Sequence, residues 1–388
     1  MAIQYPDPIH GLIEIPSRYE ELIQSPVISR LRNVKQLGFT PSIYIGAVHT
    51  RFEHTLGSVS VLMRLLNQFG IQDAQVRHRY LVLGLLSEIG SPPLSYSTRW
   101  IFQIYNGLRK ADYAKALFDT FLRSYDLLGK EEYEVVWSTV PGMKKEMWFT
   151  EAPAMANFPE LTPLKLARDI DYVLRDGYYT GRYSKTFDVR HFLSLRKNDT
   201  AEMNESIQEL YRAIYALNAV YGDKTRRFLN RILARLSAIL IREGHLDAKS
   251  YADPNVFIYL DDDEFLADMR RAVDRSGSDL LVRMYSMITQ LEPMHIEQIP
   301  FSYAWRELGL EDVEELIAEE RFKQKEAVFC INDTYSNEIG YVLFGRHFGS
   351  FMEGVRSEFF SRYTGLGAAS DSNRTGMMDE GHLFVVAI

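Results

Sequence analysis

Two histidines, an arginine and a glutamate lie within six residues of one another, at His49, Arg51, Glu53 and His54. Imidazole and carboxylate groups bind metal ions, and a guanidinium binds phosphate. The apolar residues that follow recur every three or four positions as far as Phe69, so the polar residues are predicted to open a buried helix. Such a group borders a binding site, or it is the polar first turn of a helix with Arg51 and Glu53 in solvent. The residue types alone leave both interpretations open.

Four further motifs accompany this segment along the chain. They are Asp7-Pro-Ile-His-Gly11, Ile28-Ser-Arg-Leu-Arg-Asn-Val-Lys-Gln-Leu-Gly38, Leu85-Leu-Ser-Glu-Ile-Gly-Ser-Pro-Pro-Leu-Ser-Tyr96 and Arg168-Asp-Ile-Asp-Tyr-Val-Leu-Arg-Asp176. With His49–Gly57 between them, they resemble the HD-domain deoxynucleoside triphosphate triphosphohydrolases, a family of bacterial dGTPases and of a vertebrate dNTPase with a sterile-alpha-motif domain. The resemblance covers about residues 5–185 and implies a mainly α-helical HD-domain fold.

In that family a metal ion is held by a histidine, an adjacent His-Asp pair and a distant aspartate. The matching positions in this chain are His54, Ser87, Glu88 and Arg168, and two further family histidines are replaced at Ser91 and Tyr96. His54 and Glu88 are too few ligands for a catalytic ion, and a guanidinium at Arg168 repels a divalent cation. We therefore expect a degenerate metal site with no metal or other cofactor, in which His54 and Glu88 are remnants of the catalytic machinery.

In a rival interpretation the protein is still an active enzyme. In it, Glu88 replaces the lost aspartate and Asp169 or Asp171 turns inward, so that a divergent phosphohydrolase retains a rebuilt site. Against it, the next position along a helix points about 100° away from Arg168. Glu88 near the end of an apolar helix needs a partner, for which the candidates are Arg51, Arg168 and His54.

The residues that bind the nucleotide in the resembled family are kept. The resemblance implies that Gln36 and Asp176 bind the sugar hydroxyl, that Tyr172 packs on the sugar, and that Arg51 contacts phosphate. Arg168 would add a second phosphate donor. The alternative is a buried network that only stabilises the fold, with Arg51–Glu53 and Arg175–Asp176 as structural pairs. Tyr178 or Tyr179 either stacks on a base or packs locally.

A regulatory guanine pocket of the vertebrate relative is matched by Gln24, Ser29 and Arg32, of which only the arginine is kept, so we expect no GTP activation. The resemblance favours a non-catalytic, nucleotide-binding regulator, sensor or subunit of a homo- or hetero-oligomer, in nucleotide homeostasis or antiviral defence. The alternatives are the rebuilt phosphohydrolase and a structural partner of an active homologue.

Spacing of apolar residues predicts the elements that position these side chains. Helices are expected at about 17–24, 26–36, 53–69, 77–90, 99–109, 110–128, 130–139, 163–177, 201–220, 223–243 and 261–275, after an extended start at 1–17. We place a helical core at 1–292 and an α+β part at 293–388. The second part has helices at 302–308, 311–319 and 349–363, a β-hairpin from runs 326–332 and 338–344, a mobile loop at 365–381 and a strand-like end at 382–388.

The composition of the chain limits the classes of partner that it is expected to bind. The net charge of −8 over 388 residues argues against general binding to nucleic acid, and the basic face of residues 224–235 is interpreted as solvated. The single cysteine, Cys330, excludes an intrachain disulfide and is interpreted as a buried apolar residue. No apolar stretch approaches the roughly 20 residues of a membrane helix, and no signal peptide is evident. We therefore expect a cytoplasmic protein that does not associate with a membrane. The acidic run Asp261–Glu264 is a helix start, not a calcium loop.

Overall fold

The computed structural model describes residues 2–125, 163–182, 187–196, 199–289, 295–300, 328–332 and 382–387. Five predicted elements lie outside these residues: the helices at 130–139, 302–308, 311–319 and 349–363, and the β run at 338–344. The predicted loop at 365–381 lies outside them too.

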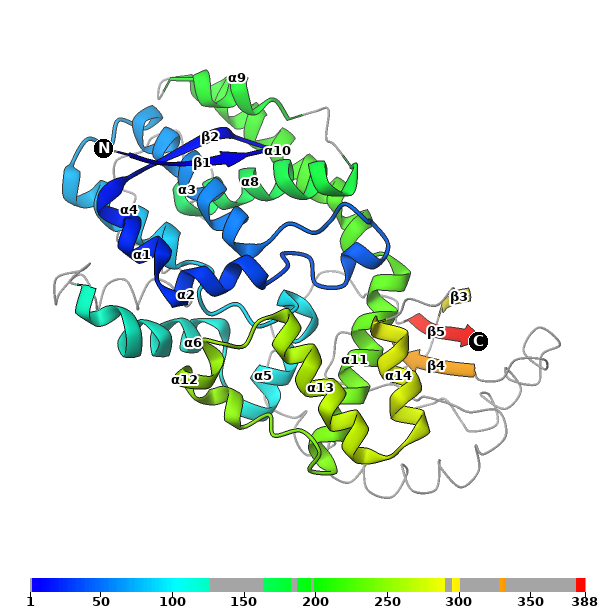
Figure 1. Ribbon diagram of the computed structural model, residues 1–388. Helices are drawn as coiled ribbons and strands as arrows, with labels where there is room; N and C mark the ends of the chain where they lie inside the picture. Colours follow the sequence, from blue (N-terminus) through cyan, green and yellow to red (C-terminus); the bar gives the residue numbers. More distant parts are fainter. Residues whose placement is uncertain are drawn as a thin grey trace, which may run out of the picture. The chain divides into compact units, whose positions relative to one another are not determined.

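The protein is mainly α-helical, as the sequence predicts (Figure 1). The chain starts with strands β1 (Ala2–Asp7) and β2 (Gly11–Pro16), which form an antiparallel hairpin in the segment predicted to be extended. The helices of the first half are α1 (Glu20–Gln24), α2 (Pro26–Ser29), α3 (Arg51–Gln68), α4 (Ala74–Leu86), α5 (Arg99–Asn106) and α6 (Lys110–Leu117). Those that follow are α8 (Pro163–Thr180), α9 (Val189–Ser194), α10 (Thr200–Tyr221), α11 (Lys224–Arg242), α12 (Pro254–Phe257), α13 (Asp262–Ser276) and α14 (Asp279–Thr289).

Helix α3 begins where the polar segment of the sequence predicts a helix start. The Thr50 hydroxyl accepts a hydrogen bond from the Glu53 amide, and the Glu53 carboxylate accepts one from the Thr50 amide at 2.6 Å. This reciprocal capping satisfies two amides that a helix start otherwise leaves unpaired. Helix α3 packs along α8 and α4, and its apolar residues from Leu56 to Leu66 are buried. The two motif-bearing helices α3 and α8 are thereby held side by side.

Several predicted boundaries are corrected. The helix predicted at 26–36 ends at Ser29 and continues as a short 3-10 turn, Arg30–Asn33, before the chain becomes extended at Val34. The long helix predicted at 110–128 is α helix only to Leu117. A short π-helix, Phe118–Leu122, and a 3-10 turn, Arg123–Tyr125, follow it. Helix α14 was not predicted from the sequence.

The chain divides into two units by its internal contacts. The first comprises Met1–Arg226 and Leu236–Tyr285, and the second comprises Arg227–Arg235 and Ser286–Ile388. The second unit contains a sheet of β3 (His295–Pro300), β5 (His382–Ala387) and β4 (Val328–Asn332), with β5 in the centre and antiparallel to both neighbours. The predicted final strand is β5, and the first run of the predicted hairpin is β4. A domain boundary near residue 292 stays a prediction.

Candidate functional site

Glu88 is the centre of the first of three polar groups in the first unit. Its side chain is fully buried, and one oxygen, Oε2, accepts hydrogen bonds from Arg51 at 2.9 Å, Lys110 at 2.6 Å and the Ser91 hydroxyl at 2.8 Å. The other oxygen accepts one from Arg168 at 2.6 Å. We call these five residues the Glu88 cluster. Three cationic side chains therefore share one carboxylate.

The side chains of Lys110 and Arg168 are each 32% exposed, whereas that of Arg51 is buried. Burial opposes ionisation of Glu88, but Lys110, Arg51 and Arg168 hold the pKa of its carboxyl well below the usual range. Burial, together with the charges of Arg168 and Arg51, lowers the pKa of Lys110 to about 7 against the opposing effect of Glu88. The two arginines stay charged and already neutralise the carboxylate, so a third positive charge at Lys110 is disfavoured. Positive charge is thus in excess at the partly exposed edge of this cluster.

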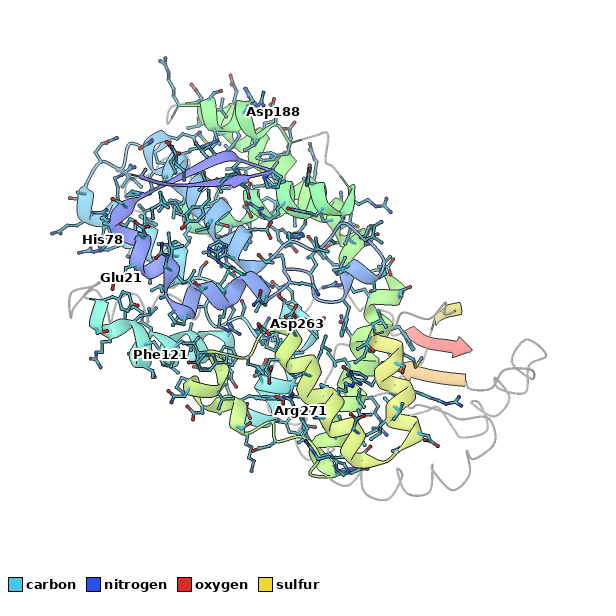
Figure 2. All side chains as sticks on the ribbon, viewed as in Figure 1. Glu21, His78, Phe121, Asp188, Asp263 and Arg271 are labelled. Carbon is cyan, nitrogen blue, oxygen red and sulfur yellow. The ribbon has the colours of Figure 1, made fainter. Side chains whose placement is uncertain are left out.

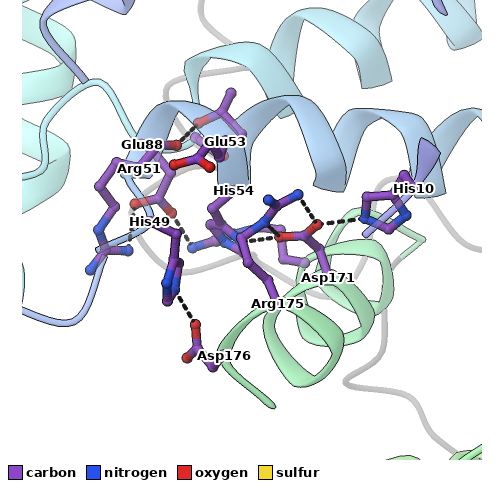
Figure 3. A network of polar contacts seen from close by, with 12 residues as sticks. His10, His49, Arg51, Glu53, His54, Glu88, Asp171, Arg175 and Asp176 are labelled. Carbon is purple, nitrogen blue, oxygen red and sulfur yellow. Dashed lines mark hydrogen bonds and ion pairs between the residues drawn. The ribbon is translucent and has the colours of Figure 1, made fainter. Parts of the chain in front are cut away.

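Asp171 is the centre of the second group, the Asp171 cluster. Its carboxylate accepts hydrogen bonds from His10 Nε2 and His54 Nδ1, both at 2.7 Å, and from two nitrogens of Arg175 at 3.0 and 3.1 Å (Figure 3). Arg175 also donates to Asp7 at 2.8 Å, which links the β1–β2 hairpin to helix α8. Burial opposes this ionisation too, but Arg175, His10 and His54 keep the pKa of Asp171 well below its usual range.

Close packing in the Asp171 cluster depends on Gly57 of helix α3. A Cβ at this position would lie 2.0 Å from Asp171 Oδ1 and 2.4 Å from a terminal nitrogen of Arg175. Only a residue without a side chain lets the two helices approach this closely. The Gly57 of the motif is therefore explained by packing around the carboxylate.

Asp176, one helical turn beyond Tyr172, is the centre of the third group, the Asp176 group. It accepts hydrogen bonds from His49 Nε2 at 2.7 Å and from the Tyr221 hydroxyl at 2.6 Å, and Tyr221 stacks on Tyr172 with 5.4 Å between ring centroids. His49 Nδ1 is buried without a hydrogen-bond partner among the described residues. In the tautomer that donates from Nε2, this Nδ1 is a hydrogen-bond acceptor.

Gln36 lies beside His49 because the two residues face each other across a short antiparallel contact. The Gln36 amide donates to the His49 carbonyl at 2.9 Å, and Lys35 and Thr50 form a β-bridge next to them. Residues paired in this way place their side chains on the same face. Gln36 is 2% exposed and its Oε1 has no partner within the described part of the chain, so this oxygen is a second buried acceptor without a partner there.

The structure brings the predicted site residues into one region but changes several pairings. Glu88 does pair with Arg51 and Arg168, whereas His54 binds Asp171 instead. The suggested pairs Arg51–Glu53 and Arg175–Asp176 are wrong: Glu53 caps α3 and accepts from Tyr179 at 3.1 Å, and Arg175 binds Asp171 and Asp7. Tyr179 also stacks on His49, at 4.6 Å between ring centroids, so it packs locally.

Sequence reasoning missed four residues of the site: Lys110, His10, Asp7 and Tyr221. The Asp7–Gly11 motif contains Asp7 and His10 and was a signal for both, since a histidine and an aspartate in a turn of a matched motif are expected to have polar partners. Lys110 and Tyr221 carry no comparable local signal. No group of three or more His, Cys, Asp or Glu side chains suited to a metal ion occurs among the residues that the structure describes. Within the same residues, no helix has the length and apolar character needed to cross a membrane.

No family model matches the chain. An uncharacterized protein of Mycoplasma pneumoniae is 31% identical over 267 residues, which are 65% of this chain and 56% of that protein. The deoxynucleoside triphosphate triphosphohydrolase SAMHD1 homolog of Dictyostelium discoideum is 24% identical over 282 residues, 66% of this chain and 52% of that protein. The matches thus span about half the length of these curated relatives.

Two solved structures share the fold. A hypothetical protein from Aquifex aeolicus has a TM-score of 0.61 at 19% identity and covers 100% of this chain and 96% of its own. A phosphohydrolase from Bacteroides thetaiotaomicron has a TM-score of 0.60 at 19% identity, covering 81% and 82%. The chain is thus similar in sequence to SAMHD1 homologues, and it shares its fold with a solved phosphohydrolase.

Proposed function

We propose that this chain binds a deoxynucleoside triphosphate or a closely related nucleotide and holds it without metal-dependent cleavage. The observation that carries the proposal is the Glu88 cluster. Its carboxylate, which stands at the position of a metal ligand in the resembled family, is occupied by three cations and a hydroxyl. A divalent ion would have to displace those cations, whereas an anionic phosphate is attracted by them.

The Asp176 group complements this charge with sites for a hydroxylated ligand. Asp176, His49 Nδ1 and Gln36 Oε1 are acceptors, and the last two are buried without partners among the described residues. Leaving a buried acceptor unpaired costs about 1–3 kcal/mol, which a hydroxyl donor would recover. A ligand with a sugar hydroxyl at one end and phosphates at the other matches both groups. Arg51 connects them, because its guanidinium binds Glu88 and approaches the Gln36 carbonyl at 3.4 Å.

The role that follows is that of a regulator or sensor, alone or as a subunit of a homo- or hetero-oligomer. Deoxynucleotide concentrations report on replication and on viral infection, so we place this role in nucleotide homeostasis or antiviral defence. The tyrosine pair Tyr172–Tyr221 supplies a flat apolar surface for the sugar.

The test is a thermal shift assay of the full chain in EDTA with each of the four dNTPs, with tripolyphosphate, and with 2′-deoxyadenosine. Ligand at about 100 times its dissociation constant stabilises a protein by about 2.7 kcal/mol, which is readily measured as a rise in Tm. Arg168→Gln should weaken tripolyphosphate and dNTP binding about tenfold and leave deoxyadenosine unaffected. Lys165→Gln, on the same helix and paired with Asp169, is the matched control.

Absence of stabilisation by every dNTP and by tripolyphosphate would reject the proposal and favour a structural partner of an active homologue. A second candidate function, a rebuilt phosphohydrolase, is favoured by the hydrogen bond between His54 and buried Asp171, which orients an imidazole as in a general base. Release of phosphate or triphosphate that His54→Gln abolishes would establish that enzyme instead.

A further inference from the structure

Residues 89–95, here called the 89–95 turn, connect helix α4 to the short turn at Ser95–Ser97 and supply two hydroxyls to the site. Ser91 donates to Glu88, and the Ser95 hydroxyl accepts from Arg51 Nε at 2.9 Å. The Ser95 hydroxyl also donates to the Lys35 carbonyl at 2.6 Å. The orientation of Arg51 therefore depends on the conformation of this turn.

That conformation is unfavourable for its own sequence. Leu94 and Ser95 both have φ of 53°, in the left-handed region that only glycine, and to a lesser degree Asn or Asp, adopts readily. Two consecutive non-glycine residues in this region need outside contacts to hold them. Gly38 also approaches the turn, and a Cβ there would lie 2.6 Å from the Leu94 carbonyl oxygen.

Asp262, 168 residues further along the chain, supplies such a contact. Its carboxylate accepts the Leu94 amide at 2.5 Å and the Lys35 amide at 3.0 Å, and the residue is 1% exposed. The N-cap of helix α13 is the preceding residue, Asp261, which accepts the Glu264 amide at 3.0 Å. The carboxylate of Asp262 thus reaches away from its own helix and joins two segments that carry Ser95 and Gln36.

Arg30 binds the first residues of the 89–95 turn. Its buried guanidinium donates to the carbonyls of Ile89 and Ser91, each at 3.1 Å, and to that of Leu260 at 2.8 Å. Arg30 and Asp262 therefore bind backbone groups of the 89–95 turn, and both connect it to the segment that begins α13. Burial raises the pKa of Asp262 to about 6 against the opposing effects of the Leu94 and Lys35 amides, so ionising this group has a cost in the folded state.

We propose that Asp262 is a positioning residue for the ligand site: it holds the left-handed turn at Leu94–Ser95 so that Ser95 aims Arg51 at the phosphates of the bound nucleotide. Arg30 holds the same turn through the carbonyls of Ile89 and Ser91. This proposal rests on the proposed function for its ligand, but the geometry of the turn is independent of it. The site would then be assembled partly from a helix that contributes no ligand contact.

The experiment compares Asp262→Asn with Asp263→Asn in the full chain. Asp263 is exposed at the start of α13, so its variant removes the same charge from the same helix end (Figure 2). Asparagine at 262 keeps one acceptor and directs an NH₂ group toward the second amide. We expect amide hydrogen exchange of residues 89–96 to become about tenfold faster in Asp262→Asn and unchanged in Asp263→Asn. Tripolyphosphate should bind about tenfold more weakly to the first variant only.

A second variant separates positioning from general stability. Ser95→Ala removes the links to Arg51 and to the Lys35 carbonyl but leaves the Asp262 carboxylate on Leu94, so binding should weaken while exchange of the turn rises less than in Asp262→Asn. Unchanged exchange in Asp262→Asn, or equal loss of binding in Asp263→Asn, would overturn the proposal. If the unmodified protein binds neither tripolyphosphate nor any dNTP, the proposed function fails, and the exchange measurement alone decides whether Asp262 organises the turn.

Discussion

The Asp171 and Glu88 clusters lie close together and both include residues of helices α3 and α8, but their charges are arranged in opposite ways (Figure 3). Asp171 is fully enclosed, and each of its oxygens has at least two donors. Glu88 is equally buried, but two of the three cations around it are one-third exposed. Buried charges are retained when they are fully paired, whereas an excess of one sign at an exposed edge favours an external counterion. The contrast separates a cluster that holds the helices together from one that we propose binds a ligand.

The largest effect is expected for Asp171→Asn. Removing one partner of a buried, hydrogen-bonded ion pair costs about 3–5 kcal/mol, because Arg175 would keep only Asp7. Urea unfolding of Asp171→Asn should therefore show a much lower midpoint, while Asp169→Asn on the same helix should change it little. Near-equal stability of the two variants would contradict the assignment of the Asp171 cluster to holding the helices together.

Glu88→Gln should separate stability from ligand binding. The variant leaves Arg51, Lys110 and Arg168 facing a neutral amide, so the free protein should lose about 1–3 kcal/mol. The remaining cations should then attract phosphate more strongly, and the rise in Tm caused by saturating tripolyphosphate should exceed that of the unmodified protein. A smaller rise would show that Glu88 organises the cations more than it competes with the anion.

The smallest effect concerns pH. With the pKa of Lys110 lowered to about 7, its side chain loses a positive charge as pH rises through 7, so tripolyphosphate binding should weaken by several-fold between pH 7 and 9. Lys110→Arg keeps the charge throughout this range and should bind with little pH dependence. Isothermal titration calorimetry at each pH measures both. Parallel pH profiles in the two proteins would assign the effect to another group.

The pattern of the sequence predicted the helices that carry the site because α3 and α8 have regular apolar spacing and a strong helix start at Thr50. It also gave Arg51, Arg168 and His54 as candidate partners of Glu88, and the first two pair with it. Partners that depend on distant packing were not predictable: His10 meets Asp171 across 161 positions, and Lys110 has the local sequence of a surface lysine. Adjacent charges such as Arg175 and Asp176 suggested a pair, but neighbouring positions on a helix point in different directions.

Gly57 has a consequence for how the protein can vary. Because a single added carbon at this position would collide with both Asp171 and Arg175, Gly57→Ala would disturb His10, His54 and the N-terminal hairpin together rather than one contact at a time. Such a substitution should lower the Tm of the protein although it changes no residue of the Glu88 cluster.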